Sequence, residues 1–236
     1  MRSPLASGQW IEIDEVTSTQ DVARESLLDP SQSAGVIFAA QQTRGRGRFD
    51  RAWFSEKGNS LTMSLICREQ ADHPRAWLVG MAVAAASAAV IHSRLRWPND
   101  LYLDGKKVGG VLTEIMPDHQ GRSVPVVGLG INLDVLEFPA DIAVHATSLA
   151  LHRPGVHEPR EVGKAIVERL RDMPEPEHWS DLQPIWTLFD DTPGKRYRLI
   201  SGEEAIAIGI GPEGELVCAV EGETTMVMAA EAILGS

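Results

Sequence analysis

Residues 41–53 read QQTRGRGRFDRAW, a stretch that alternates arginine with glycine between two apolar segments. Four of its thirteen residues are arginines, and guanidinium groups bind phosphates and carboxylates through paired hydrogen bonds. Glycine lets the backbone approach a ligand closely. The stretch therefore predicts an anion-binding loop, with no regular element over residues 42–58. Two alternatives stay open: a solvated surface loop and an RNA-binding Arg-Gly segment.

Apolar patterning around this loop predicts β-strands with packed helices. Apolar and acidic residues alternate over residues 10–16, as in an edge strand, and an amphipathic helix then runs to Leu28 from an N-cap at Ser18 or Thr19. Small apolar residues predict a long buried helix at residues 74–93, which begins at a proline. Further strands are predicted at residues 35–40, 60–67, 101–103, 107–115 and 124–133, and further helices at residues 162–171 and 181–189.

The pattern changes near residues 191–194. From Gly194 onward, short strand-like runs alternate with glycine-containing turns at the spacing of a small β-barrel. These strands are predicted at residues 197–200, 205–210, 216–220 and 225–228. We therefore expect a second, smaller unit at the C-terminal end.

Composition excludes several classes of protein. The chain of 236 residues has 22 Lys and Arg against 33 Asp and Glu, a net charge of −11, so its average field repels nucleic acid and anionic membranes. The longest apolar run, residues 78–91, is shorter than the roughly 20 residues that span a bilayer. Two cysteines are too few for a disulfide framework or a zinc site, and no signal peptide is recognisable, so we expect a cytoplasmic protein.

Residues 96–103, RWPNDLYL, form a second informative stretch. Pro98 fixes a turn out of a strand and so presents Asn99 and Asp100 at its end, where layered folds often place functional groups. Lys107 follows Asp100 by seven residues and precedes two glycines. In the alternative interpretation, Asn99 and Asp100 form a turn that is capped by their own side chains, and Lys107 is an exposed strand residue.

Residues 128–132, GLGIN, place glycines inside an apolar strand. This pattern indicates the close approach of a ligand or of another backbone, and a β-bulge is the alternative. Residues 17–20, TSTQ, precede the first predicted helix. Their hydroxyl groups could simply cap that helix.

In this order and spacing, the stretches resemble the catalytic module of biotin protein ligases over nearly the whole chain. The resemblance implies an α+β fold: a mixed central sheet of the class II synthetase type in a catalytic domain over residues 1–191, and a small SH3-like β-barrel over residues 192–236. It also implies a ligase that activates biotin with ATP as biotinyl-adenylate. The biotin then passes to a lysine of a carrier domain in a biotin-dependent carboxylase.

The resemblance assigns the two substrates to different groups of residues. Ser18, Thr19 and Gln42 would bond the ureido ring of biotin, and Arg48 and Lys107 would neutralise its carboxylate and the α-phosphate of ATP. The complete set implied for biotin is Ser18, Thr19, Gln20, Gln42, Arg46, Gly47, Arg48, Lys107, Gly110 and Gly128.

For ATP, Trp53 would pack on the adenine and Asn132 would bond its edge. The complete set implied for the nucleotide is Arg46, Arg48, Arg51, Trp53, Asn99, Asp100, Lys107 and Asn132. Arg48, Lys107 and Asp100 are the candidate catalytic residues, with Asp100 as the hypothetical base for the carrier amine. Mg²⁺ is expected to bind mainly through substrate phosphates, without a dedicated protein site.

Two departures from the family pattern affect the loop and the first helix. Gln20 stands where the family usually has asparagine, and Phe49 and Asp50 replace a stretch that normally includes glycine. The functional alternatives are a lipoate-attaching enzyme on the same fold and a biotin-binding sensor without catalysis. Only 17 residues precede Ser18, too few for the helix-turn-helix module of bifunctional members, so DNA binding is not expected. An exposed edge strand could mediate homodimerisation or dock the carrier.

Overall fold

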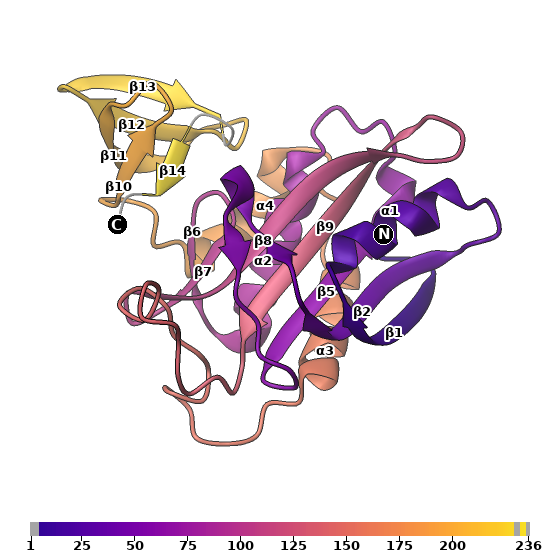
Figure 1. Ribbon diagram of the computed structural model, residues 1–236. Helices are drawn as coiled ribbons and strands as arrows, with labels where there is room; N and C mark the ends of the chain where they lie inside the picture. Colours follow the sequence, from indigo (N-terminus) through magenta and orange to yellow (C-terminus); the bar gives the residue numbers. More distant parts are fainter. Residues whose placement is uncertain (1–4, 229–231, 235–236) are drawn as a thin grey trace.

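The computed structural model describes residues 5–228 and 232–234, which form two large sheets, a two-stranded ladder and four α-helices (Figure 1). The larger sheet has seven strands in the order β1-β2-β5-β9-β8-β7-β6. Its β1–β2 pair is parallel and the remaining pairs are antiparallel. The strands are β1 (Gln9–Val16), β2 (Ala34–Gln42), β5 (Ser60–Ile66), β6 (Arg94–Arg96), β7 (Asp100–Leu103), β8 (Lys106–Pro117) and β9 (Ser123–Asn132).

The two faces of this sheet differ because successive side chains of a strand point to opposite sides. On one face, Leu61, Met63 and Leu65 of β5 belong to the main hydrophobic core, together with residues of three helices. On the other, Ile66 packs with Leu27 in a smaller core beneath α1. Helix α1 (Thr19–Leu28) covers this second face, and α2 (Trp77–Ile91), α3 (Pro159–Arg171) and α4 (Trp179–Phe189) cover the first.

Helix α2 is buried almost all round, as its small apolar residues predicted. A Cβ placed on Gly80 would lie 2.0 Å from Thr113 Oγ1 of β8, so glycine permits the helix to lie this close to the sheet. The helix begins at Trp77 instead of Pro74. His73 Nδ1 accepts the backbone N–H of Arg75 at 3.0 Å, and this turn delays the first helical residue.

The segment between β2 and β5 was expected to lack regular structure, and this is wrong in part. Strands β3 (Gly45–Arg46) and β4 (Ala52–Trp53) form a short antiparallel ladder around a 3₁₀ turn, η1 (Arg48–Asp50). Phe49 takes a left-handed conformation with φ 56°. A second 3₁₀ turn, η2 (Arg68–Gln70), follows β5.

The C-terminal strands form a five-stranded antiparallel sheet in the order β13-β12-β11-β10-β14. Among the described residues β13 and β14 do not pair, so the SH3-like unit is an open sheet and not the closed barrel that was expected. The division into domains at residues 191/192 stays a prediction. The strands are β10 (Arg196–Leu199), β11 (Glu204–Ile210), β12 (Leu216–Val220), β13 (Glu223–Val227) and β14 (Ala232–Leu234).

Trp97 connects the two sheets. Its indole Nε1 donates to the carbonyl of Gly214 at 2.8 Å, and its own carbonyl accepts the hydroxyl of Tyr197 at 2.7 Å. Its backbone N–H donates to Thr192 Oγ1 at 3.0 Å. The C-terminal unit is therefore bonded to the residue that stands just before Pro98 and Asn99.

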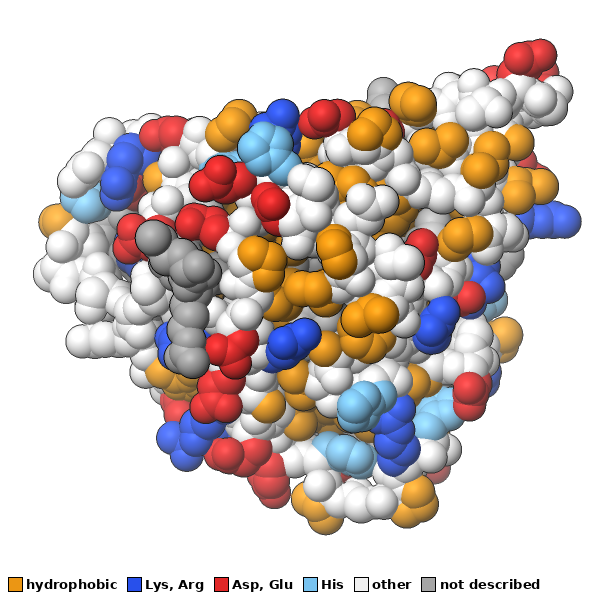
Figure 2. Space-filling view, turned by 180° about the vertical axis from the view of Figure 1, so that it is seen from behind, with side chains coloured by type: hydrophobic (Ala, Val, Ile, Leu, Met, Phe, Trp, Pro, Cys, Tyr) orange, Lys and Arg blue, Asp and Glu red, His pale blue; other side chains and the backbone are white. Residues whose placement is uncertain are grey.

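Seen from behind, hydrophobic side chains gather on the projecting C-terminal sheet (Figure 2). Ile206 and Ile208 of β11 and Met226 of β13 are more than half exposed there. Within the described part of the chain, no helix is long and apolar enough to cross a membrane.

Candidate active site

Three glycines form the floor of the candidate site, on the sheet face that carries α1. Gly110 of β8 pairs with Gly130 of β9, and Leu112 pairs with Gly128, so these residues point to one face. The chain between β2 and β5 crosses in front of β8 and β9 on this face (Figure 1). We refer to Gly110, Gly128 and Gly130 as the glycine floor.

Polar side chains meet at one end of the floor, at the start of α1. Thr19 donates from its backbone N–H and from Oγ1 to Gln42 Oε1, at 2.8 and 3.0 Å. Its Oγ1 also bonds Ser64 Oγ at 2.7 Å. Ser18 caps the helix by accepting the N–H of Gln20 at 3.3 Å. Four residues predicted to bind biotin therefore lie together. Ser64, which the sequence analysis did not identify, lies beside them and bonds Thr19.

Gln20 lies across Gly128. A Cβ on Gly128 would lie 3.1 Å from Gln20 Nε2, which donates to the carbonyl of Leu112 at 3.2 Å. Gln20 Oε1 is buried and has no hydrogen-bond partner among the described residues. A buried acceptor without a partner is costly, so this oxygen is suited to an N–H donor of a ligand.

Arg46 is held by carboxylates of the same chain. It donates to Asp21 Oδ1 at 2.8 Å and lies 3.6 Å from Glu114 Oε2. Gly47, the next residue, donates its backbone N–H to the carbonyl of Arg51 at 2.7 Å, which closes the β3–β4 turn. The sequence did not reveal the two carboxylates, because they belong to α1 and β8.

Two cations converge on Asp100 at the other end of the floor. Lys107 Nζ lies 2.6 Å from Asp100 Oδ1. Burial lowers the pKa of Arg48, and the carboxylate of Asp100 is the largest influence that raises it. A Cβ on Gly110 would lie 3.3 Å from Lys107 Nζ and 3.4 Å from Asp100 Oδ1, so glycine leaves room for this pair. Lys107 therefore pairs with Asp100, and Arg48 is within the electrostatic influence of the same carboxylate, while their joint action on a ligand stays a prediction.

Trp53 covers the middle of the floor. A Cβ on Gly130 would lie 2.4 Å from its indole ring, and Lys107 Nζ lies 6.0 Å from the ring centroid. Within the part of the chain that the structure describes, the buried indole Nε1 has no hydrogen-bond partner. Gly130 belongs to the noted GLGIN stretch, but the sequence did not show that Trp53 would require it.

The remaining predicted nucleotide residues differ in their surroundings. The Asn99 side chain bonds the carbonyl of Val111 within the sheet and thus has a structural partner. Asn132 Nδ2 donates to the carbonyl of Thr147 at 3.0 Å, while its buried Oδ1 has no hydrogen-bond partner in residues 5–228 and 232–234. Arg51 follows η1, and its charge lowers the pKa of Arg48 slightly further.

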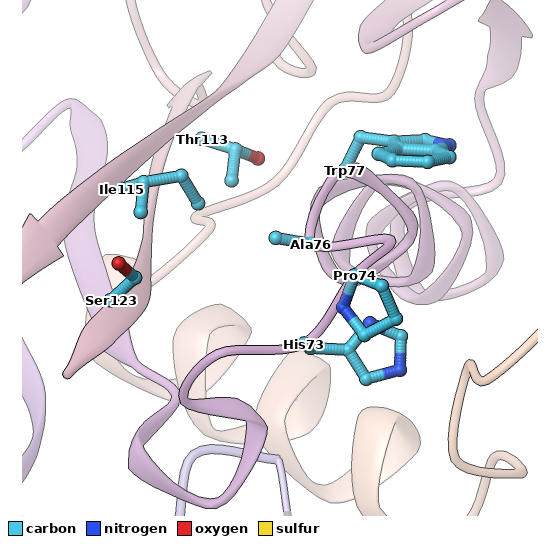
Figure 3. A pocket seen from close by; sticks show the side chains of 7 residues that line it. All are labelled: His73, Pro74, Ala76, Trp77, Thr113, Ile115 and Ser123. Carbon is cyan, nitrogen blue, oxygen red and sulfur yellow. The ribbon is translucent and has the colours of Figure 1, made fainter.

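A cavity of about 390 Å³ lies on the other side of the sheet. Thr113 and Ile115 of β8 line it opposite His73 and Trp77 at the start of α2 (Figure 3). Because Thr113 faces α2, the sheet separates this cavity from the glycine floor. It contains none of the predicted site residues.

Comparison with known proteins identifies the family. The sequence profile described as "Biotin/lipoate A/B protein ligase family" matches residues 12–132. This range includes the glycine floor, the arginine-rich residues 41–53, and Lys107. The chain belongs to this family.

Individual relatives of this biotin/lipoate ligase chain cover most of its length. It is 29% identical to the bifunctional ligase/repressor BirA of Bacillus spizizenii, over 94% of the chain and 73% of that protein. It is 27% identical to the biotin–[acetyl-CoA-carboxylase] ligase of Mycobacterium tuberculosis, over 97% of the chain and 91% of that protein. The biotin protein ligase of Aquifex aeolicus, solved with biotin and ATP, has the same fold, with a TM-score of 0.72, 24% identity and coverage of 96% and 98%.

Proposed function

We propose that this chain is a biotin–protein ligase that makes biotinyl-adenylate and transfers the biotin to a carrier lysine. The convergence of Arg48 and Lys107 on Asp100, beside the glycine floor, is the observation that carries this proposal. The Thr19, Gln20 and Gln42 end would receive the ureido ring of biotin. The Asp100 end would then hold the biotin carboxylate against the α-phosphate.

In the first step, a carboxylate oxygen of biotin attacks the α-phosphorus, the bond to the β-phosphate breaks, and pyrophosphate leaves. Both reactants are anions, so the reaction depends on cancelling their repulsion. Arg48 and Lys107 supply two positive charges, and the partial burial of Arg48 strengthens their effect because the local dielectric is low. As the two substrates bind, Lys107 exchanges its ion pair with Asp100 for contacts with their anionic groups.

We propose that Mg²⁺ accompanies ATP. No group of three or more His, Cys, Asp or Glu side chains that could hold a metal ion occurs among the described residues. Mg²⁺ commonly binds through substrate phosphates together with one or two carboxylates. Asp100 is the carboxylate that would contact it, and a ribose hydroxyl is the alternative partner of Asp100. When bound, the ion would neutralise the phosphate oxygens.

The nucleotide base would pack on the Trp53 ring, near Asn132. The buried Asn132 Oδ1 is an acceptor, and the exocyclic amine of adenine is a donor, so the two are complementary. Trp53 would offer its ring for packing. Arg51 stands close enough to Arg48 to add charge on the phosphate side.

In the second step, a carrier lysine attacks the activated carbonyl carbon, the bond to the phosphate oxygen breaks, and AMP leaves. A free lysine with a pKa of about 10.4 is almost entirely protonated at pH 7. We propose that Asp100 accepts a proton from this amine or orients it. Asp100→Asn tests this role: transfer from preformed adenylate at the wild-type rate would refute it.

The decisive experiment measures exchange of labelled pyrophosphate into ATP with biotin, with lipoate and without either acid. We expect exchange only with biotin. Exchange with lipoate alone would support the other branch of the family, and biotin binding without exchange would support a sensor.

Arg48→Ala and Lys107→Ala test the residue assignment. Each should lower exchange by about 10²–10³-fold, because a charge that stabilises the transition state is lost. Lys106→Ala, an exposed neighbour, is the control and should keep wild-type exchange. Normal exchange in both site variants would refute the assignment.

The acceptor protein and the cellular compartment are proposed from membership of the family. The acceptor would be a carrier domain of a biotin-dependent carboxylase, and the protein would work in the cytoplasm. DNA binding is not expected, and a gel-shift assay with biotin and ATP tests this. A homodimer stays a prediction that the elution volume in size-exclusion chromatography can test.

A further inference from the structure

A short segment, residues 145–152, replaces β9 beside β8 at the position of Lys107. Strand β9 ends at Asn132, and its ladder with β8 begins only at Gly109. At Lys107, the segment forms a parallel bridge in its place. The N–H of Lys107 donates to the carbonyl of His145 at 2.7 Å, and the carbonyl of Lys107 accepts the N–H of Thr147 at 2.9 Å. We refer to residues 145–152 as the strap.

The strap also holds Asn132. The Asn132 side-chain amide donates to the carbonyl of Thr147, and the Asn132 carbonyl accepts the N–H of Leu149 at 3.1 Å. Because its Nδ2 is engaged, the Asn132 amide has a defined orientation with Oδ1 left over. Thr147 therefore bonds Lys107 through its N–H and Asn132 through its carbonyl.

The side chain of Thr147 continues into a row of three groups. Thr147 Oγ1 lies 2.8 Å from His152 Nε2, and His152 Nδ1 lies 3.0 Å from Asp104 Oδ2. A neutral His152 with its proton on Nδ1 donates to Asp104 and accepts from Thr147. Asp104 stands in the turn between β7 and β8, so the row connects the strap to the hairpin that carries Lys107.

The order Thr-His-Asp resembles a nucleophilic relay, but Thr147 is only 2% exposed. A buried hydroxyl cannot reach a substrate. The geometry therefore suits positioning of the neighbouring residues and not attack on a ligand.

We propose that Asp104, His152 and Thr147 are positioning residues that set the spacing of Lys107 and Asn132 for ATP. The inference rests on the proposed function, which assigns Lys107 to the biotin carboxylate and the α-phosphate, and Asn132 to the adenine. The strap bonds Lys107 and Asn132 and not the Thr19, Gln20 and Gln42 end. Loss of the row should therefore weaken ATP binding, which depends on both residues, more than biotin binding, which depends on Lys107 alone of the two.

Thr147→Val removes the hydroxyl but keeps the shape and the backbone bonds, and His152→Ala removes the next member of the row. In biotin-dependent pyrophosphate exchange, we expect each to raise the KM for ATP about tenfold, an effect of the size that one buried hydrogen bond produces. The Kd for biotin should change less than twofold. Thr147→Ser keeps the hydroxyl and should restore the wild-type KM.

His157→Ala is the matched control. His157 Nδ1 bonds Asp134 Oδ1 at 2.6 Å on the same loop, but this pair bonds none of the site residues. The KM for ATP of the His157→Ala variant should stay at the wild-type value. Unchanged ATP parameters in Thr147→Val and His152→Ala would overturn the proposal, as would an equal loss of biotin and ATP binding.

A second readout separates this inference from the function. The Kd of α,β-methylene-ATP, which cannot release pyrophosphate, is measured with saturating biotin. If the wild type shows no exchange, the proposed function fails. The positioning role of the row would still be supported if Thr147→Val raised the Kd of the ATP analogue and Thr147→Ser did not. If the wild type binds no nucleotide, both proposals fail.

Discussion

Gly128 has no side chain at the point where Gln20 crosses the sheet. A Cβ there would lie 3.1 Å from Gln20 Nε2, so Gly128→Ala should displace Gln20 from the carbonyl of Leu112. We expect the free energy of unfolding to fall by about 1 kcal/mol. Gln20→Asn, which shortens the side chain, should reduce the penalty of Gly128→Ala.

Urea unfolding of the two single variants and the double variant measures this coupling. Strictly additive effects would contradict the contact. Biotin binding should weaken in Gly128→Ala even where the protein stays folded.

At the residue scale, sequence motifs predicted which side chains matter but not what they contact. Gly110 and Gly128 were expected to bind biotin, which stays a prediction, and the sequence did not show that the side chains of Lys107 and Gln20 would lie against them. The partners of Arg46 could not be predicted, because nothing local places a carboxylate of β8 beside a residue of β3. Such pairs depend on how strands distant in sequence are ordered in the sheet.

At the scale of elements, Gly80 controls how closely α2 approaches β8. Gly80→Ala would place a Cβ 2.0 Å from Thr113 Oγ1, and neither the buried helix nor the central strand can move away cheaply. We expect destabilisation of about 1–3 kcal/mol, measured by denaturant unfolding. Thr113→Ala in the same chain should recover part of it, and no recovery would show that another contact is responsible.

Element types followed from periodicity, whereas several boundaries did not. The strands around the glycine floor and the four α-helices of the described residues were predicted because their apolar patterns are strong. The start of α2 was misplaced because His73 caps a turn through its side chain, a contact that periodicity does not encode. The β3–β4 ladder was missed because two-residue strands have no detectable period.

At the scale of the whole molecule, Tyr197 joins the C-terminal sheet to the residues before Asp100. Burial raises the pKa of Tyr197, so its hydroxyl keeps the proton that it donates to Trp97. Tyr197→Phe should leave the Trp97 carbonyl buried without this donor and lower the free energy of unfolding by about 1–3 kcal/mol.

Ser201→Ala is the control for this prediction, because Ser201 bonds the exposed Glu203 within the turn between β10 and β11. It should change stability by less than about 0.5 kcal/mol. Equal stability of Tyr197→Phe and the wild type would show that the hydroxyl does not stabilise the junction. The sequence predicted a second unit but not this junction, since no pattern connects residue 197 with residue 97.

The ion pairs of Arg46 and Lys107 determine what can compete for these cations. Each already faces a carboxylate, at 2.8 Å from Asp21 and 2.6 Å from Asp100. A sulfate or chloride ion would have to displace that carboxylate, and the net charge of −11 opposes its approach. A larger organic acid also gains binding free energy, because its apolar ring is removed from water. We therefore expect inorganic salts to be weak inhibitors, and bulky organic acids to be the ligands that are admitted.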